Sequence, residues 1–260
     1  MLSKEEKERY ARQLILEEVG EEGQEKLKEA RVLMVGAGGL GSPCTFYLAA
    51  VGVGTIGIVD SDVVELSNLQ RQILHQTESL GELKVDSAEK TLQALNPELT
   101  IEKHKIRLDQ NNAREIVSRY DVIINGVDNF PTRYLLNDAC YMEKKPLVEG
   151  GVLRFDGLLM TILPDEGPCY RCIFPEIPAE GSVPSTSEAG LLGTIPGICG
   201  TIQATEAVKV ILKIGETFTG RVLAFHALKG HFDVMEWPQE KSCPLCGENP
   251  TIQVPGEKGS

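Results

Sequence analysis

The sequence predicts an α/β protein with a Rossmann-like, mostly parallel sheet that has helices on both faces, followed by antiparallel strands and a zinc site made of four cysteines. Three observations carry this prediction. A glycine-rich turn, Gly36-x-Gly38-x-x-Gly41, joins an apolar strand to a helix. Apolar strands and amphipathic helices then alternate up to about residue 148. From Gly157 onward, strand-like segments follow one another as in an antiparallel sheet.

The elements of the parallel part can be justified in chain order. Ser3 and Glu6 have capping-box spacing, which predicts a helix at the N-terminus. Pro131 suits the first turn of a helix, and Asp109 is a candidate helix cap. Apolar runs predict strands at 32–35, 55–59, 122–124 and 146–148. Helical spacing predicts helices at 21–28, 42–51, 82–95, 109–119 and 131–144.

The second part has a different pattern. Antiparallel strands are expected at 158–163, 221–225 and 232–237, and an apolar stripe predicts a long helix at 200–214. Residues 176–190 are rich in Pro, Ser, Gly and Glu, which is typical of a mobile surface loop. We therefore expect one domain over 1–260, made of N-terminal helices (1–30), a βαβ part (31–150) and an antiparallel part (151–260).

Composition excludes several classes of function. The 260 residues include 26 Lys and Arg against 38 Asp and Glu, a formal net charge of −12. This acidic balance argues against a nucleic-acid or anionic-membrane binder. Residues 32–59 carry no charged side chain, but their glycines and Pro43 favour a buried strand–turn–helix–strand over a membrane span. The odd number of cysteines, seven, fits a reducing compartment, so we expect a cytoplasmic protein.

The glycine turn predicts a phosphate site, because its backbone N–H groups can approach phosphate at a helix N-terminus. Asp60 ends the second strand, where a carboxylate can accept hydrogen bonds from ribose hydroxyls. These features alone favour NAD. The run from Ser67 to Gln72, which includes Asn68 and Arg71, and then Lys84 favour ATP instead, because a leaving pyrophosphate needs concentrated positive charge. The carboxylate of the Asp128-Asn129 pair is placed to hold Mg²⁺.

Two C-x-x-C pairs predict a metal site. They are Cys169 with Cys172 and Cys243 with Cys246, and together they supply four thiolates for a closed, structural zinc site. A redox dithiol would need a thioredoxin-like context, which is absent here. The remaining cysteines are interpreted as buried packing residues: Cys44, Cys140 and Cys199.

At these residues the chain resembles the MoeB/ThiF/HesA family of ubiquitin-activating-enzyme-like adenylyltransferases, from Tyr10 to Cys246. The resemblance implies a homodimer that uses Mg-ATP to adenylate the C-terminal Gly-Gly carboxylate of a small ubiquitin-like sulfur carrier, for molybdopterin or thiamine-type sulfur insertion. It implies catalytic roles for Arg12, Arg71, Lys84 and Asp128, with Arg12 reaching the neighbouring subunit. It implies nucleotide contacts at Gly39, Gly41, Asp60, Ser67, Asn68, Arg71, Lys84, Asp128 and Asn129.

One residue departs from the family pattern. Sulfur-carrier members commonly have a cysteine two residues before Glu-Ala-Gly in the loop, and here Thr186 occupies that place. Threonine forms neither a thioester nor a persulfide, so we expect an acyl-adenylate product with sulfur delivered by another protein. The chain ends soon after Cys246, and no sulfurtransferase domain is expected within it. The alternatives are adenylation of another peptide or protein C-terminus, an NAD-dependent oxidoreductase, and a zinc-stabilised scaffold without catalysis.

Overall fold

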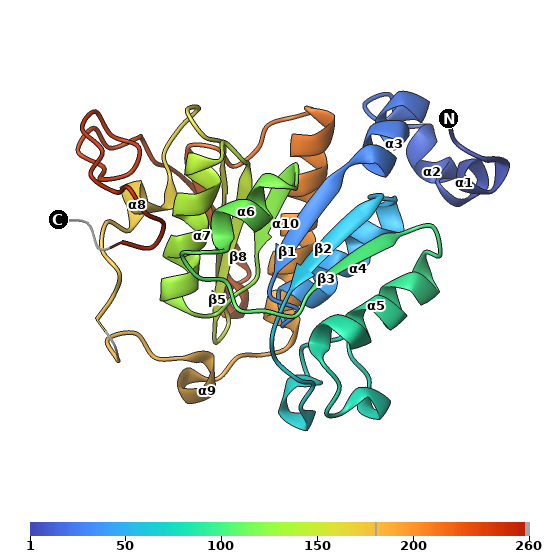
Figure 1. Ribbon diagram of the computed structural model, residues 1–260, viewed down its shortest axis with the longest axis horizontal. Helices are drawn as coiled ribbons and strands as arrows, with labels where there is room; N and C mark the ends of the chain where they lie inside the picture. Colours follow the sequence, from blue (N-terminus) through green and yellow to red (C-terminus); the bar gives the residue numbers. More distant parts are fainter. Residues whose placement is uncertain (180, 258–260) are drawn as a thin grey trace.

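The computed structural model describes residues 1–179 and 181–257, and one eight-stranded sheet runs through it in the order β3-β2-β1-β4-β5-β6-β7-β8 (Figure 1). The first five strands in this order pair in parallel. Their bounds are β1 Arg31–Val35, β2 Thr55–Val59, β3 Thr100–His104, β4 Val122–Asn125 and β5 Leu147–Leu153. The sequence of β1 and β4 is apolar on both faces, as parallel strands covered on both sides require.

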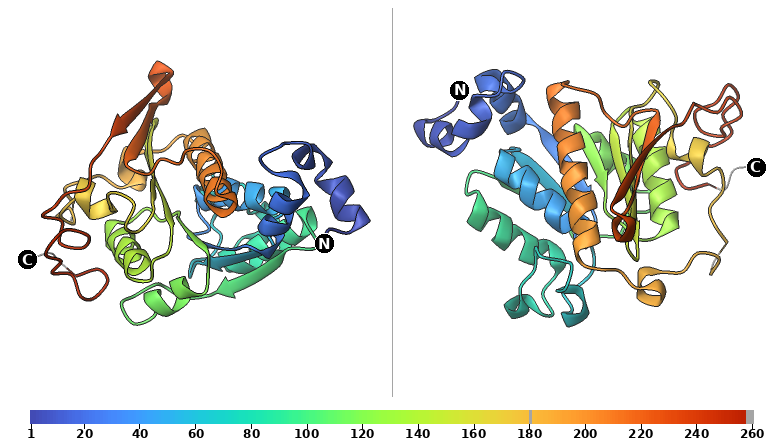
Figure 2. Two further views of the ribbon diagram at one scale, coloured as in Figure 1. Left: turned by 90° about the horizontal axis from the view of Figure 1, so that it is seen from above. Right: turned by 180° about the vertical axis from the view of Figure 1, so that it is seen from behind.

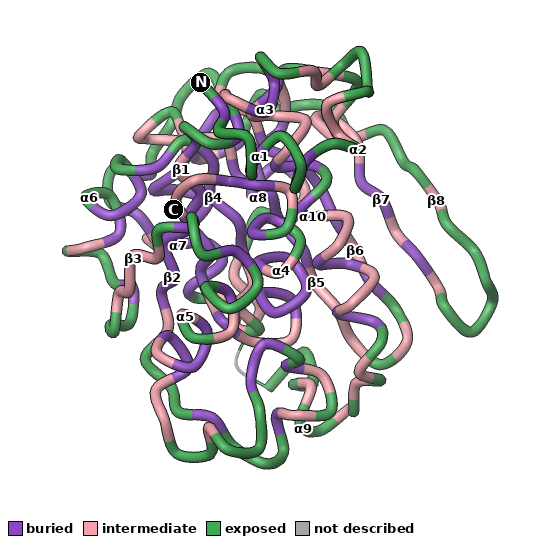
Figure 3. The backbone as a smooth tube through the Cα atoms, turned by 90° about the vertical axis from the view of Figure 1, so that its right-hand side faces the viewer, coloured by how far each residue is buried: buried purple, intermediate pink, exposed green. Residues whose placement is uncertain are grey.

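The last three strands extend the sheet in antiparallel fashion. They are β6 Asp156–Ile162, β7 Arg221–His226 and β8 His231–Glu236. The β7–β8 hairpin projects from the body of the protein and leaves β8 as an exposed edge (Figure 3). The expected fold class, a mostly parallel α/β sheet followed by antiparallel strands, is confirmed.

Helices cover both faces of the parallel part (Figure 2). On one face the apolar side chains of α3, α4, α5 and α10 pack against the sheet, and on the other face those of α6 and α7 do. The helices have the bounds α1 Lys4–Arg9, α2 Ala11–Leu14, α3 Gly20–Glu29, α4 Gly41–Val51, α5 Lys84–Leu95, α6 Ala113–Ser118, α7 Phe130–Met142, α8 Tyr170–Ile173, α9 Thr186–Ala189 and α10 Thr194–Leu212. Short 3₁₀ turns lie at Leu66–Asn68, Thr77–Ser79 and Ala227–Lys229.

Several local predictions are confirmed by specific contacts. Ser3 and Glu6 form a reciprocal capping box on α1. Pro131 lies in the first turn of α7, where its missing N–H costs no hydrogen bond. The charge-free run 32–59 forms β1, α4 and β2, which are largely buried. It is a core element, as expected.

The structure differs from the sequence predictions at several elements. Helix α6 begins at Ala113 with Asn112 as its N-cap, whereas the predicted helix began at Asp109. The Asp109 carboxylate instead accepts the N–H groups of Asn111 and Asn112 at 2.8 Å and 3.1 Å, in the turn before the helix. The predicted loop 176–190 contains the short helix α9. Strand β3 was not predicted, because Thr-Ile-Glu-Lys-His is polar and lies at the edge of the sheet. Helix α10 was predicted to begin at residue 200 but begins at Thr194. Pro196 and Gly197 lie near its start, and both residue types have low helix propensity. Gly200, the predicted start, lies inside the helix: a Cβ there would lie 2.4 Å from the carbonyl oxygen of Leu40, so the glycine lets α10 approach α4 closely.

Side chains of α10 also form hydrogen bonds to the backbone of β4 and of the segment before β7. Gln203 donates from Nε2 to the carbonyl of Asn125 at 2.7 Å, and the Glu206 carboxylate accepts from the N–H of Phe218 at 2.8 Å. By length and composition α10 is apolar enough to cross a membrane, yet half of that window is buried inside the structure. A core helix passes the same test, and α10 is packed against the sheet as one.

Candidate functional site

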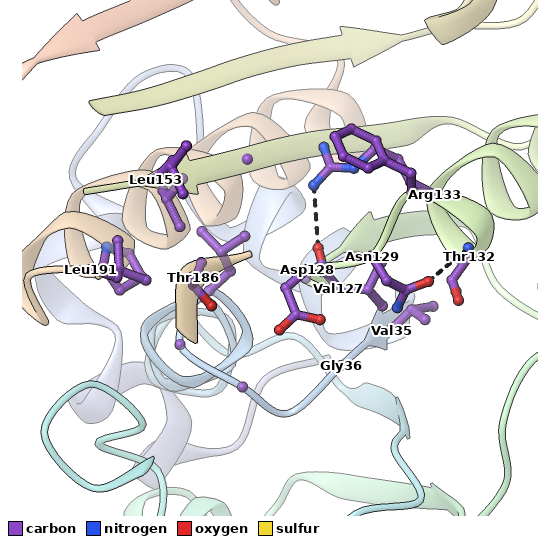
Figure 4. A pocket seen from close by; sticks show the side chains of 18 of the residues that line it. Val35, Gly36, Val127, Asp128, Asn129, Thr132, Arg133, Leu153, Thr186 and Leu191 are labelled. Carbon is purple, nitrogen blue, oxygen red and sulfur yellow. Dashed lines mark hydrogen bonds between the residues drawn. The ribbon is translucent and has the colours of Figure 1, made fainter. Parts of the chain in front are cut away.

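A cavity of about 700 Å³ lies at the carboxyl ends of the parallel strands (Figure 4). The residues that follow β1, β2 and β4 line one side of it, and residues of β5, β6 and α9 line the other. Ligands of open α/β sheets bind at this edge, where strand ends and helix N-termini converge. The cavity is therefore the candidate active site.

The glycine turn forms the floor of the cavity, and its glycines serve different purposes. Gly36 has φ +97°, a conformation that favours glycine. Gly41 begins α4, and a Cβ there would lie 2.0 Å from the carbonyl oxygen of Gly36. Gly41 thus closes the turn and does not line the cavity. Gly38 and Gly39 do line it, and the nearest atom to a Cβ at Gly38 would be 3.8 Å away.

Asp60 directly follows β2, beside the glycine turn. Its Oδ2 accepts the N–H of Ala37 at 2.8 Å, and its Oδ1 accepts the N–H of Asp62 at 2.8 Å. The carboxylate therefore holds the glycine turn against the loop after β2. Each oxygen keeps lone pairs for a further donor, which is compatible with the predicted contact to ribose hydroxyls.

Arg71 and Lys84 both line the cavity, as the sequence predicted. Lys84 is the first residue of α5, its side chain is 8% exposed, and its Nζ lies 3.0 Å from a carboxylate oxygen of Asp62. Asp62 is itself 70% exposed, so this ion pair is open to exchange with a bound anion. Arg71 donates from Nη1 to the Ser67 carbonyl at 3.0 Å, which leaves its other nitrogens available.

Ser67 and Asn68 were predicted to contact the nucleotide, and the structure places both outside the lining of the cavity. Ser67 is exposed, and Asn68 is buried with its Oδ1 accepting the N–H of Glu65 at 3.2 Å. In this structure the two residues build the 3₁₀ turn from which Arg71 extends. A direct contact with phosphate stays a prediction.

Asp128 and Asn129 follow β4 and line the cavity. The side chain of Asn129 caps α7 by accepting the N–H of Thr132 at 3.0 Å. The carboxylate of Asp128 is exposed and points into the cavity, on the side that faces Thr186 of α9 (Figure 4). A carboxylate in this position, beside a phosphate-type turn, is a suitable Mg²⁺ ligand.

Arg12 is not brought together with the other predicted catalytic residues. It lies exposed on α2, at the opposite end of the sheet from the cavity (Figure 1). Arg12 is not among the residues that line the cavity of its own chain. Its predicted role is therefore possible only if a second subunit presents it.

Two further residues near the glycine turn were not predicted as site residues, although Gln72 ends the run 67–72. Gln72 lines the cavity and is 4% exposed, and its Oε1 has no hydrogen-bond partner among the described residues. His75 contacts the carbonyl of Ala37 through Nε2 at 2.9 Å and the hydroxyl of Ser87 through Nδ1 at 3.0 Å. Burial lowers the pKa of His75, which favours the neutral ring. Proximity to Arg71 in the sequence was the one indication for either residue.

The far arm of the cavity is mainly apolar. It is lined by residues of β5 and β6 and by the segment around α9, namely Val152, Leu153, Gly157, Leu158, Pro184, Thr186 and Leu191. The cavity thus joins an apolar wall to the polar glycine turn.

The four cysteines of the two C-x-x-C pairs converge, as predicted. All four are buried, and their sulfur atoms lie within 4.8 Å of one another. The Sγ atoms of Cys172 and Cys246 are 3.3 Å apart, and those of Cys169 and Cys243 are 3.6 Å apart. A tetrahedral zinc site with Zn–S bonds of about 2.3 Å has sulfur–sulfur edges of about 3.8 Å. The cluster therefore fits a tetrahedral metal ion after small movements.

Two features support this cluster as a metal knuckle. The backbone N–H of Glu240 donates to the sulfur of Cys172 at 3.4 Å, a bond that stabilises a thiolate. A Cβ at Gly247 would lie 2.4 Å from the carbonyl oxygen of Lys241, so the turn after the second pair requires glycine.

The other three cysteines are buried, in agreement with the packing role predicted for them. Burial raises the pKa of Cys199 to about 12 and raises that of Cys44 as well. A thiol held protonated in this way is a poor nucleophile.

Comparison with known proteins gives a consistent result. Residues 10–245 match the ThiF family. The chain is 49% identical to the SAMP-activating enzyme E1 of Haloferax volcanii over 241 residues, which is 93% of this chain and 89% of that protein. It is 49% identical to the sulfur carrier protein adenylyltransferase of Thermus thermophilus over 254 residues, which is 96% of this chain and 94% of that protein.

The fold is also found in solved structures. A crystal structure of E. coli MccB has a TM-score of 0.81 with 21% identity, over 92% of this chain and 75% of that chain. The match over nearly the whole length, together with the glycine turn and the cysteine cluster, shows that this chain belongs to the MoeB/ThiF family.

Proposed function

We propose that this protein uses ATP to adenylate the C-terminal Gly-Gly carboxylate of a ubiquitin-like sulfur-carrier protein, with release of pyrophosphate, in molybdopterin or thiamine-type sulfur transfer. The single observation that carries the proposal is the cavity itself. It joins a phosphate-type glycine turn, two cations and a carboxylate to an apolar arm at one strand edge. Relatives over nearly the full length are named as a sulfur carrier protein adenylyltransferase and a SAMP-activating enzyme.

The residues present fit ATP. The turn leaves open space at Gly38, where a side chain would otherwise project, and the buried Oε1 of Gln72 beside it has no partner among the described residues. The ribose hydroxyls or the adenine amino group of a nucleotide can donate a hydrogen bond to this oxygen, whereas the phosphates cannot. In Rossmann-like folds an acidic residue about 20 positions after the glycine turn binds the ribose hydroxyls, and Asp60 lies at this sequence separation.

The chemistry needs positioning and charge stabilisation more than proton transfer. The attacking carboxylate is already ionised near neutral pH, so no general base is required. Arg71 and Lys84 would stabilise the negative charge that develops as the bond to the leaving pyrophosphate breaks. The apolar arm would exclude water from the acyl-adenylate, which otherwise hydrolyses.

Asp128 would hold Mg²⁺, which neutralises triphosphate charge when bound. Its carboxylate is exposed beside the expected phosphate site. Proteins usually supply one or two carboxylates to Mg²⁺, and phosphate oxygens and waters supply the other ligands. Asn129 contributes by capping α7 and fixing the backbone next to Asp128.

The four-cysteine cluster would hold a structural zinc ion. It fastens the segment around Cys243 and Cys246 to α8, and four ligands leave no open position for catalysis. Because such a site needs reduced thiols, we expect the protein in a reducing compartment, the cytoplasm.

We also propose that the protein works as a homodimer over a single adenylation domain of residues 1–260. The position of Arg12, exposed and remote from the cavity of its own chain, supports a role at the partner's site. Mixing two inactive variants, Arg12→Ala and Asp128→Ala, should restore activity if one intact cavity can receive one intact arginine. A mixture as inactive as each variant alone would contradict a dimer in which Arg12 of one subunit serves the cavity of the other.

Thr186 lies in α9 and lines the cavity, yet it offers no thiol. We infer that the product is the acyl-adenylate and that sulfur comes from another protein.

The test is carrier-dependent exchange of pyrophosphate into ATP. The expected result is exchange with a carrier that ends in Gly-Gly and none with the same carrier lacking its last glycine. Exchange with unrelated peptide C-termini would indicate a different substrate within the same chemistry. Thermal stabilisation by NAD but not by Mg-ATP would contradict the proposal and favour an oxidoreductase.

A further inference from the structure

A buried polar network lies beneath the loop that carries Asp128. Glu149, on β5, is fully buried. Its Oε2 accepts a hydrogen bond from Nδ2 of Asn125 at 2.7 Å, and its Oε1 accepts one from Nη1 of Arg133. Arg133 is on α7, one turn after the helix begins, and it lines the cavity. The proposed adenylation chemistry does not account for this ion pair.

The network hydrogen-bonds both the N–H and the carbonyl of Val127. The N–H of Val127 donates to Oδ1 of Asn125 at 3.1 Å. Its carbonyl accepts from Nη2 of Arg133 at 3.2 Å, the bond drawn beside Asp128 in Figure 4. The next residue is Asp128, and the one after it, Asn129, is fixed as the cap of α7. The backbone is therefore held on each side of an otherwise exposed carboxylate.

General stability does not explain why charged groups are used here. Burying an ion pair costs desolvation energy, and apolar side chains of similar volume often stabilise a core equally well. An apolar residue in place of Arg133 would, however, leave the Val127 carbonyl without its donor. The surroundings also fit the guanidinium closely: a Cβ at Gly151 would lie 3.2 Å from Nη1, and the ring of Tyr170 is 5.7 Å from Cζ.

We infer that Arg133, anchored by Glu149, is a positioning residue that fixes the Val127 carbonyl and thereby the direction in which Asp128 enters the cavity. The planar fork of arginine is suited to this task, because it bonds a carboxylate and a carbonyl at once with fixed geometry. The inference rests on the proposed function, since it assigns Arg133 to the support of the magnesium ligand.

The test is the Mg²⁺ dependence of ATP binding, measured by calorimetry with the full-length protein and without a carrier. Arg133→Lys keeps the charge that Glu149 needs but removes the fork. We expect the Mg²⁺ concentration for half-maximal ATP affinity to rise about tenfold, the size typical for a residue that supports a metal ligand. Binding of ATP without Mg²⁺ should change little.

A double-mutant cycle separates support of Asp128 from direct contact with the nucleotide. If Arg133 acts through Asp128, then R133K in the D128N background causes no further shift in Mg²⁺ dependence. Additive shifts in the cycle would overturn the inference. Should R133K fail to fold, Glu149→Gln removes the anchor while keeping shape and should shift the same curve in the same direction.

A matched control is available in Arg171→Lys. Arg171 pairs with Asp138 at 2.7 Å in an equally buried site, with side chains 1% and 0% exposed, and it does not line the cavity. R171K should lower stability without moving the Mg²⁺ dependence. An equal shift in R171K, or none in R133K, overturns the inference alone. Absence of Mg²⁺-dependent ATP binding in the unmodified protein would overturn the proposed function as well.

Discussion

Two glycines of the same turn should respond differently to substitution by alanine: one substitution should lower stability, and the other should weaken only ATP binding. Gly41 has no room: its Cβ would lie 2.0 Å from the carbonyl oxygen of Gly36, well inside the closest normal contact. The backbone of the turn or of α4 must move by about 1 Å or more, which costs about 3 kcal/mol as in other overpacked sites. Gly38 has room, since its Cβ would meet only Nε2 of Gln72 at 3.8 Å.

The consequence for Gly38→Ala is specific to the ligand. Without nucleotide, its free energy of unfolding should stay within about 1 kcal/mol of the unmodified protein, because the added methyl group enters open space. With Mg-ATP the methyl group lies where phosphate is expected. The unmodified protein should gain about 2.7 kcal/mol at ATP a hundredfold above Kd, and G38A should lose most of that gain.

Urea unfolding with and without Mg-ATP measures both effects. Gly41→Ala should unfold at lower urea in either condition, and G38A should differ from the unmodified protein only when ATP is present. Full stabilisation of G38A by Mg-ATP would refute the assignment of this turn to phosphate. An unchanged midpoint for G41A would refute the steric argument.

Other predictions concern residues at the cavity and the cysteine cluster. Lys84→Ala should lower carrier-dependent pyrophosphate exchange about 10²–10³-fold with folding retained, as loss of a charge-stabilising group does; exchange within threefold of normal would exclude that role. Thr186→Ala should leave exchange nearly unchanged, and a collapse in exchange would assign that hydroxyl a catalytic part. Cys169→Ser should release zinc, measured by a chromogenic chelator, and lower the melting temperature; equal metal content before and after the substitution would contradict a four-cysteine site. Burial lowers the pKa of His75 below the ordinary value near 6.5, so its contribution to stability is present above that pH and is lost as pH falls through the folded pKa. His75→Gln should flatten the fall in urea midpoint below pH 6.5, and an unaltered pH profile would show that the ring does not titrate on unfolding.

Much of the fold was accessible from the sequence because hydrophobic pattern and burial agree along its length. The apolar strands β1, β2 and β4 are buried on both faces, so continuous apolar runs identify them. Strand β3 was not predicted because an edge strand needs few apolar residues, and the sequence of β3 is mostly polar. The start of α10 was missed because the segment before residue 200 contains Pro196 and Gly197, and both residue types have low helix propensity.

The site shows the same division. Asp60, Arg71, Lys84 and Asp128 were found because each follows a strand end or a motif, and chain order alone brings such residues to one edge. Arg133 and Glu149 were not found, because their roles depend on hydrogen bonds across two elements. A lone acid directly after the apolar Leu147-Val148 was the available hint of a buried charge.

The central claim is that a carrier carboxylate attacks the α-phosphate of ATP in this cavity, and isotope transfer tests it most directly. A Gly-Gly carrier with ¹⁸O in its terminal carboxylate is incubated with the protein, Mg-ATP and hydroxylamine, which cleaves the acyl-adenylate at carbon. The account predicts one ¹⁸O atom in each AMP released, together with pyrophosphate. Unlabelled AMP, or ADP in place of AMP, would contradict it.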